Sequence, residues 1–322
     1  TNYPLVDRVR AVETFRTPKN LLLKCLIFIG IFILVQVIAS FGMYAGIMPE
    51  LMKWAMETAQ ANGGELSTME LQEKLATLLQ DPKMTNIMLY ATGLATIGTL
   101  IYCRFVEGRK LNTIGFKAKG GLIQYLLGLV AGFVMFSMVV LLAWAMCGLT
   151  LNGFQGSSWT GLLVVFIGYG IQGMSEEVIC RGYFMTTILR HQNVYWAVGL
   201  NSLFFGLMHA GNSGFSAFAL LNLVLYAVMI SIYMLRTDNL WGACAIHSIW
   251  NFVQGNFYGL PVSGIDSGAS VFSMSLKGSI LANGGDFGLE ASLATTIVMA
   301  AVITLLLFVP PFTKKQTQES AA

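Results

Sequence analysis

Two adjacent glutamates and an arginine lie inside an apolar stretch of the chain, in the sequence Glu176-Glu177-Val178-Ile179-Cys180-Arg181. Each ionisable side chain near the centre of a bilayer costs roughly 2.5 to 3.5 kcal/mol on insertion scales, so three together indicate a functional site. Glu177 and Arg181 are four residues apart and can form an ion pair on one helix face. Glu176 lies about 100° around the helix from Glu177. Its carboxylate is therefore left without a partner and is available as a general base.

Two of the three histidines, His209 and His247, also fall within or at the ends of apolar segments. Phe205 precedes His209 by four residues and Asn251 follows His247 by four, so each pair shares one helix face. These groups suffice for the attack of water on a carbonyl. Glu176 would take a proton from a water molecule that His209 helps to hold, while His247 and Asn251 donate hydrogen bonds to the oxyanion. The sequence therefore predicts hydrolysis by direct attack of water, without a serine or cysteine nucleophile.

The composition indicates that an integral membrane protein carries these residues. Of the 322 residues, 55% are hydrophobic and only 11% are charged, compared with about 25% charged in a soluble domain. The basic residues form no stripe, which gives no support to nucleic-acid binding. Long apolar blocks separated by short polar turns predict one all-α, polytopic membrane domain over residues 1–322.

Eight apolar runs are long enough to cross about 30 Å of hydrocarbon. They lie at residues 21–46, 84–106, 121–150, 159–189, 194–212, 215–236, 239–258 and 290–312. Residues 159–258 would form the catalytic core around an intramembrane polar cavity. Hydropathy places His209 towards the outer side of its run and Glu176 near the middle of another. Tilt, a broken helix or a different boundary would bring them together.

The distribution of basic residues predicts the orientation in the membrane. With a cytoplasmic N-terminus, all but four of the 19 basic residues face the cytoplasm, including Lys314 and Lys315 after the last run. The four on the outer side are Lys53, Lys74, Lys83 and Lys277. Both termini are therefore expected in the cytoplasm.

Two outer segments, residues 48–83 and 255–289, are long. The first contains Ser67-Thr68-Met69-Glu70, which has capping-box spacing, and a helical stripe of leucines that ends at Asp81-Pro82. It predicts a short amphipathic helix. The second is rich in glycine and serine and has no periodicity, which favours a loop over a mobile flap.

Glycines at five positions within the runs indicate close helix packing in lipid. They are Gly128, Gly132, Gly168, Gly170 and Gly173.

The three motifs EExxxR, FxxxH and HxxxN, in this order, resemble those of the CPBP family. That family comprises the CAAX prenyl endopeptidases of the Rce1 type and bacteriocin-processing or Abi relatives. The motifs match at Glu176, Glu177 and Arg181, at Phe205 and His209, and at His247 and Asn251, within residues 170–255. The resemblance implies cleavage of a peptide bond inside the membrane, with a membrane-associated peptide or protein as substrate. It also implies the roles of base, water-positioning group and oxyanion donors at the positions already singled out. The wide occurrence of the family in bacteria favours a bacterial plasma membrane as the location.

The family has also been called a metalloprotease family. Glu176, His209 and His247 could in principle hold zinc, with a water molecule in the fourth position. The chain contains neither HExxH nor another zinc-type spacing. A glutamate mechanism without a metal cofactor is therefore favoured.

Other functions are compatible with some of these residues. An ion-pair network could simply fix helix packing, and acids with histidines also mark ion or proton paths in transporters. No internal repeat of the transporter kind is present. A peptide-binding immunity protein that does not hydrolyse its ligand is the main alternative to the protease.

Overall fold

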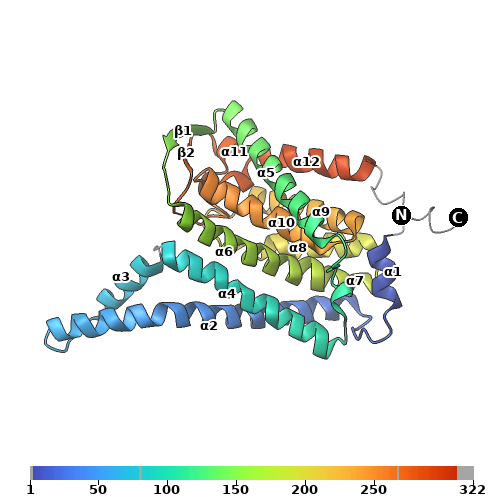
Figure 1. Cartoon of the computed structure of the whole chain (residues 1–322), viewed down its shortest axis with the longest axis horizontal. Coiled ribbons are helices and arrows are strands. Elements are labelled where there is room, and N and C mark those ends of the chain that lie inside the picture. Colours follow the sequence, from blue (N-terminus) through green and yellow to red (C-terminus); the bar gives the residue numbers. More distant parts are fainter. Residues whose placement is uncertain (1–2, 80–81, 267, 310–322) are drawn as a thin grey trace.

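The computed structural model describes residues 3–79, 82–266 and 268–309; Lys314 and Lys315 lie outside these ranges. The described chain forms a bundle of helices with one small sheet, which confirms the predicted all-α membrane bundle (Figure 1). Each of the eight predicted runs contains a helix in its described residues. They correspond to α2 (Leu21–Ala61), α4 (Pro82–Ile101) with the π-helix η1 (Tyr102–Val106), α5 (Gly121–Ala145), α6 (Trp159–Glu177) with the π-helix η3 (Val178–Met185) and α7 (Thr186–Leu189), α8 (Val194–Leu207), α9 (Ala217–Thr237), α10 (Leu240–Phe252) with the π-helix η4 (Val253–Phe257), and α12 (Leu293–Phe308).

Five helical segments of the described residues are long and apolar enough to cross a membrane. The helices α8, α10 and α12 are shorter, with 14, 13 and 16 residues. Several helices begin at a polar side chain that accepts a hydrogen bond from a backbone N–H of the first turn. These caps are Asn20 for α2, Asn193 for α8, Ser216 for α9, Asn239 for α10 and Ser292 for α12.

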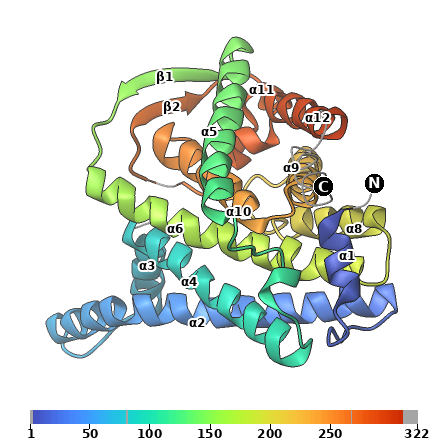
Figure 2. The ribbon, with the colours of Figure 1, turned by 45° about the vertical axis from the view of Figure 1, so that its right-hand side comes forward.

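Helix α10 lies between α5 and α6, while α2 and α4 pack together on the far side of α6 (Figures 1 and 2). Glycines permit the close approach on both sides of α10. A Cβ atom on Gly128 of α5 would lie 2.5 Å from the carbonyl oxygen of Gly242, and one on Gly173 of α6 would lie 2.6 Å from Ser248 Oγ. The prediction of close packing is confirmed at these positions. By contrast, a Cβ atom on Gly170 would meet nothing closer than 4.0 Å.

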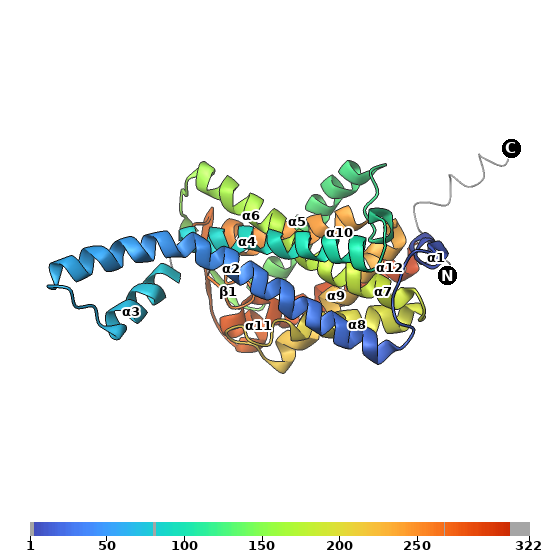
Figure 3. The same ribbon diagram turned by 90° about the horizontal axis from the view of Figure 1, so that it is seen from below.

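A long arm extends from one end of the bundle (Figure 3). It consists of the second half of α2 and of α3 (Thr68–Leu79). The predicted end of the first run at residue 46 is wrong as a helix boundary, because α2 continues without a break to Ala61.

The predicted amphipathic helix of the arm is confirmed as α3, and its capping box forms. The amide nitrogen of Ser67 donates to Glu70 Oε2 over 3.0 Å, and the amide nitrogen of Glu70 donates to Ser67 Oγ over 3.1 Å. Hydrogen bonds from the Ser67 backbone and side chain lower the pKa of the Glu70 carboxyl group. Asp81, at the predicted end of this helix, lies outside the described residues.

A two-stranded antiparallel sheet joins two segments that lie more than 100 residues apart in the sequence (Figure 2). Strand β1 (Leu149–Phe154) pairs with β2 (Phe272–Leu276), so the prediction of a loop over residues 255–289 is wrong for part of that segment. The third run was also predicted to reach residue 150, whereas α5 ends at Ala145.

The remaining elements of the described chain are short. They are α1 (Pro4–Ala11), the 3₁₀ helix η2 (Leu111–Thr113), α11 (Ile280–Asn283), and the 3₁₀ helices η5 (Gly285–Phe287) and η6 (Leu289–Ala291). Helix α1 lies at the end of the bundle opposite the arm (Figure 3).

Candidate active site

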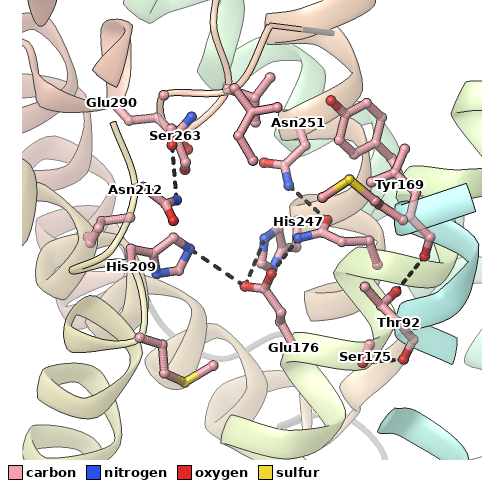
Figure 4. A pocket seen from close by; sticks show the side chains of 18 of the residues that line it. Thr92, Tyr169, Ser175, Glu176, His209, Asn212, His247, Asn251, Ser263 and Glu290 are labelled. Atoms are coloured by element: carbon pink, nitrogen blue, oxygen red, sulfur yellow. Dashed lines mark hydrogen bonds and ion pairs between the residues drawn. The ribbon is translucent and has the colours of Figure 1, made fainter. Parts of the chain in front are cut away.

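The motif residues converge from three helices (Figure 4). Glu176 lies near the end of α6, His209 follows the end of α8, and His247 lies within α10. The segment α6–η3–α7 and helix α8 form a hairpin around the turn at residues 190–193. Glu176 and His209 lie at similar distances along the chain from that turn, and the hairpin brings Glu176 Oε2 to 3.9 Å from His209 Nε2.

Both histidines face the same oxygen of Glu176. The Oε2 atom lies 3.9 Å from Nε2 of His209 and 3.8 Å from Nε2 of His247. These separations are too long for direct hydrogen bonds. One water oxygen can contact both partners of such a pair. Glu176 Oε2 is buried and has no hydrogen-bond partner among the described residues.

Glu177 faces in a different direction and connects two of the motifs. Its Oε1 atom lies 3.0 Å from Nη1 of Arg181, which confirms the predicted intrahelical ion pair. The same oxygen lies 2.8 Å from Nδ1 of His247. Glu177 and Arg181 are both 0% exposed. Each charge therefore offsets much of the other's desolvation cost, and the carboxylate fixes the orientation of the imidazole.

The partners of the two imidazoles determine which ring nitrogen carries a proton. His247 Nδ1 faces a carboxylate, and His209 Nδ1 lies 2.9 Å from the carbonyl oxygen of Phe205. Both partners can only accept, so Nδ1 carries the proton in each ring. A neutral ring then presents a lone pair at Nε2, and His247 donates through Nε2 only as an imidazolium.

Asn251 lies on the same face of α10 as His247, and its amide is bonded to a residue that sequence reasoning missed. Asn251 Nδ2 donates to Gln172 Oε1 over 2.9 Å, and Gln172 Nε2 donates to Glu176 Oε1 (Figure 4). A single glutamine inside an apolar helix gave no motif by which to recognise it.

Aromatic rings surround the charged groups. The Phe205 ring packs under the guanidinium of Arg181, 4.3 Å from its Cζ atom, and 5.9 Å from the His247 ring. The predicted supporting residue Phe205 thus contacts both motif helices. Tyr226 of α9, which sequence reasoning did not single out, stacks on Phe205 and lies 5.6 Å from the His247 ring.

The site opens into a cavity of about 840 Å³. Its walls come from α2, α4, α6, α8, α9, α10 and the loop residues 262–266 and 268. Glu176, His209, His247 and Asn251 all line it. On one wall of the cavity, Ser263 donates to Glu290 Oε2 through both its amide and its hydroxyl, each over 2.7 Å. A cavity of this volume matches that of small-ligand pockets, which typically have about 300–1,000 Å³.

As it stands, the arrangement is wider than a tetrahedral zinc site. Within the described ranges no group of three or more His, Cys, Asp or Glu side chains is placed to hold a metal. Tetrahedral zinc ligands at about 2.0–2.2 Å from the ion lie roughly 3.4 Å from one another. The two distances from Glu176 Oε2, 3.8 and 3.9 Å, exceed that value.

Comparison with protein families identifies the segment that carries the site. The family model described as "Type II CAAX prenyl endopeptidase Rce1-like" matches residues 156–253. No curated protein and no solved structure matches the chain in the two other comparisons. The matched segment begins just before α6 and ends one residue after α10, so it contains all three motifs. Residues 156–253 thus match the Rce1-like family model, and the resemblance that the motifs predicted is confirmed over that segment.

Proposed function

We propose that the protein is an intramembrane endopeptidase of the CAAX type, which hydrolyses a peptide bond of a membrane-associated peptide or protein. The observation that carries this proposal is the convergence of two imidazole Nε2 atoms on one buried oxygen of Glu176, 3.8 and 3.9 Å away, at the wall of the cavity. This geometry suits a general base that acts on a bound water molecule.

In the proposed reaction, a water molecule between Glu176 and His209 gives one proton to Glu176 Oε2 and directs its other hydrogen to His209 Nε2. Its oxygen attacks the carbonyl carbon, and the electron pair of the C=O bond moves to the oxygen. The oxyanion accepts hydrogen bonds from the His247 imidazolium and from the free N–H of Asn251. When the C–N bond breaks, the proton on Glu176 passes to the leaving nitrogen. Atoms and charges balance without a covalent intermediate.

The favoured substrate is a peptide that reaches the cavity from the bilayer, such as a prenylated CAAX tail. We place the protein in a bacterial plasma membrane with both termini in the cytoplasm, where it would serve peptide maturation or signalling. The distribution of basic residues supports this orientation.

The test replaces Glu176 by glutamine, which keeps the shape of the side chain and removes the base. Peptide termini in the membrane fraction are compared between cells that carry the wild type and cells that carry Glu176→Gln at matched expression. Purified proteins are also given a fluorogenic peptide with an S-farnesylated CAAX tail. We expect cleavage by Glu176→Gln to fall by about 10²- to 10⁴-fold, as for loss of a general base.

The matched control is Glu65→Gln, at an exposed glutamate of the arm. It should cleave as fast as the wild type. Identical termini in wild type and Glu176→Gln, with both proteins folded, would contradict the protease. Binding of the peptide without cleavage by the wild type would favour an immunity protein instead.

A further inference from the structure

Gln172 lies one helical turn before Glu176 on α6 and lines the cavity with Glu176 and Asn251. Its amide makes two hydrogen bonds, one to each of these residues. Nε2 donates to Glu176 Oε1, and Oε1 accepts from Asn251 Nδ2 over 2.9 Å. Gln172 therefore connects the proposed base on α6 to the proposed oxyanion donor on α10.

The chemistry of the three groups fixes the direction of this chain of bonds. The carboxylate of Glu176 can only accept, so the NH₂ group of Gln172 must face it. The carbonyl oxygen of Gln172 then faces Asn251, which must present its own NH₂ group. One N–H of Asn251 is used in this bond, and the second remains available for the oxyanion. Reversing any amide would place two acceptors or two donors face to face.

Close packing of α6 against α10 makes the connection possible. Gly173 follows Gln172 directly, and a Cβ atom there would lie 2.6 Å from Ser248 Oγ and 2.8 Å from the Ser248 amide nitrogen. The backbones of the two helices approach at the level of Gln172 for this reason. A glutamine side chain can then span the remaining distance to Asn251.

We infer that Gln172 is a positioning residue of the proposed hydrolysis, an inference that rests on the proposed function. It holds Oε1 of Glu176 so that Oε2 faces His209 and His247. It also sets the rotation of the Asn251 amide. Loss of the Gln172 amide should disturb the base and the oxyanion donor together.

The experiment replaces Gln172 by methionine, which has a similar length and no amide, and measures kcat and KM with the S-farnesylated CAAX peptide. We expect kcat to fall by about 10- to 100-fold, because a misplacement of about 1 Å in a catalytic group has effects of this size. KM should stay within about twofold. The matched control is Gln124→Met on α5, where the amide oxygen accepts from Tyr233 outside the site; its kcat should be unchanged.

A double variant separates positioning from simple structural support. In the Asn251→Ala background, Gln172→Met should lower kcat by a smaller factor than in the wild type, because one of its two effects is already lost. An equal factor in both backgrounds, or an unchanged kcat in Gln172→Met, would overturn the inference.

An experimental structure of Gln172→Met provides a readout that needs no substrate. We expect the Glu176 carboxylate to rotate and Oε2 to move away from the two imidazoles. If the wild type does not cleave the peptide, the CAAX proposal fails, and this structure alone decides the role of Gln172. A carboxylate in its wild-type position would overturn the inference.

Discussion

Two clusters of buried charge contact the helical segment η3–α7, one around Arg109 and one around Arg181. They differ in how many of their polar atoms have hydrogen-bond partners. In the first cluster, all three side-chain nitrogens of Arg109 are bonded. Nε donates to Thr113 Oγ1 over 3.2 Å, Nη1 donates to Glu107 and Thr187, and Nη2 donates to the carbonyl oxygen of Thr113 over 3.0 Å and to other groups. Its guanidinium also lies over the Phe15 ring.

The second cluster, at the candidate site, keeps several buried atoms without partners among the described residues. They are Glu176 Oε2, Glu177 Oε2, and Nε and Nη2 of Arg181. Leaving a buried polar atom unpaired costs about 1–3 kcal/mol, and more for charged groups. Burial of charge alone therefore does not identify the site. Buried polar atoms without hydrogen-bond partners, beside a cavity, distinguish it from a cluster that only stabilises helix packing.

The largest effect on stability is expected at the fully bonded cluster. Replacing Arg109 by methionine leaves Glu107 buried without its cation and should cost about 3–5 kcal/mol of unfolding free energy. Burial raises the pKa of Glu107, and Arg109 opposes that shift. In the variant, the loss of unfolding free energy should therefore become smaller as the pH falls towards this pKa, because protonation removes the buried charge. Thermal unfolding in detergent at several pH values measures both effects.

Two variants control this prediction. Arg104→Met removes an exposed arginine of η1 and should leave stability unchanged. Adding Glu107→Gln to Arg109→Met should restore part of the loss. Equal stability of the Arg109 and Arg104 variants would show that the hydrogen bonds of Arg109 add nothing to the free energy of unfolding. The two charge clusters would then not differ in their effect on stability.

A smaller effect on stability, with a larger one on activity, is expected at the open cluster. Replacing Gly173 by alanine pushes α6 from α10 at Ser248 and should cost about 1–3 kcal/mol through overpacking. Cleavage of the farnesylated peptide should fall by roughly 100-fold, because the displacement reaches Gln172 and the neighbouring glutamates. Unfolding and cleavage are measured on the same preparation.

The control for that variant lies on the same helix. A Cβ atom on Gly161 would meet only Ser158 Cβ, at 3.9 Å, so Gly161→Ala should retain full activity. If Gly173→Ala also cleaves at the wild-type rate, the spacing of α6 and α10 does not set the geometry of the site.

The smallest effect is expected from metal removal. Because the proposed mechanism uses no metal, dialysis against EDTA should change the cleavage rate by less than about twofold. Addition of zinc to the dialysed protein should not raise the rate. Loss of activity that zinc restores would mean that a metal occupies the open cluster, and the proposed role of Glu176 as base would be wrong.

Hydropathy and residue spacing predicted much of this molecule. Apolar runs required helices because a membrane offers no partner for free backbone groups. The four-residue spacing of Glu177 and Arg181 predicted their ion pair, and the order of the three motifs predicted the family. The family match does not test the catalytic roles of Glu176, His209 and the α10 residues, which stay predictions.

Other features could not be predicted because they depend on distant partners or on mixed signals. Strand β1 has the apolar composition of a span end, and only its pairing with β2, more than 100 residues later, defines it as a strand. Hydropathy locates the edge of the membrane but not the end of a helix, so the continuation of α2 to Ala61 was missed. The bond between Glu177 and His247 required the packing of α6 on α10.

The length of α2 has a mechanical consequence. At 1.5 Å per residue, its 41 residues extend for about 60 Å along the helix, roughly twice the thickness of the hydrocarbon layer. Over this length, a tilt of about 10° about the N-terminal end of the helix would displace its C-terminal end by roughly 10 Å. Phe32 and Gln36 line the cavity from the near half of the same helix. A change in the tilt of α2 with bilayer thickness would therefore move the cavity wall and the arm together, with the larger displacement at the arm.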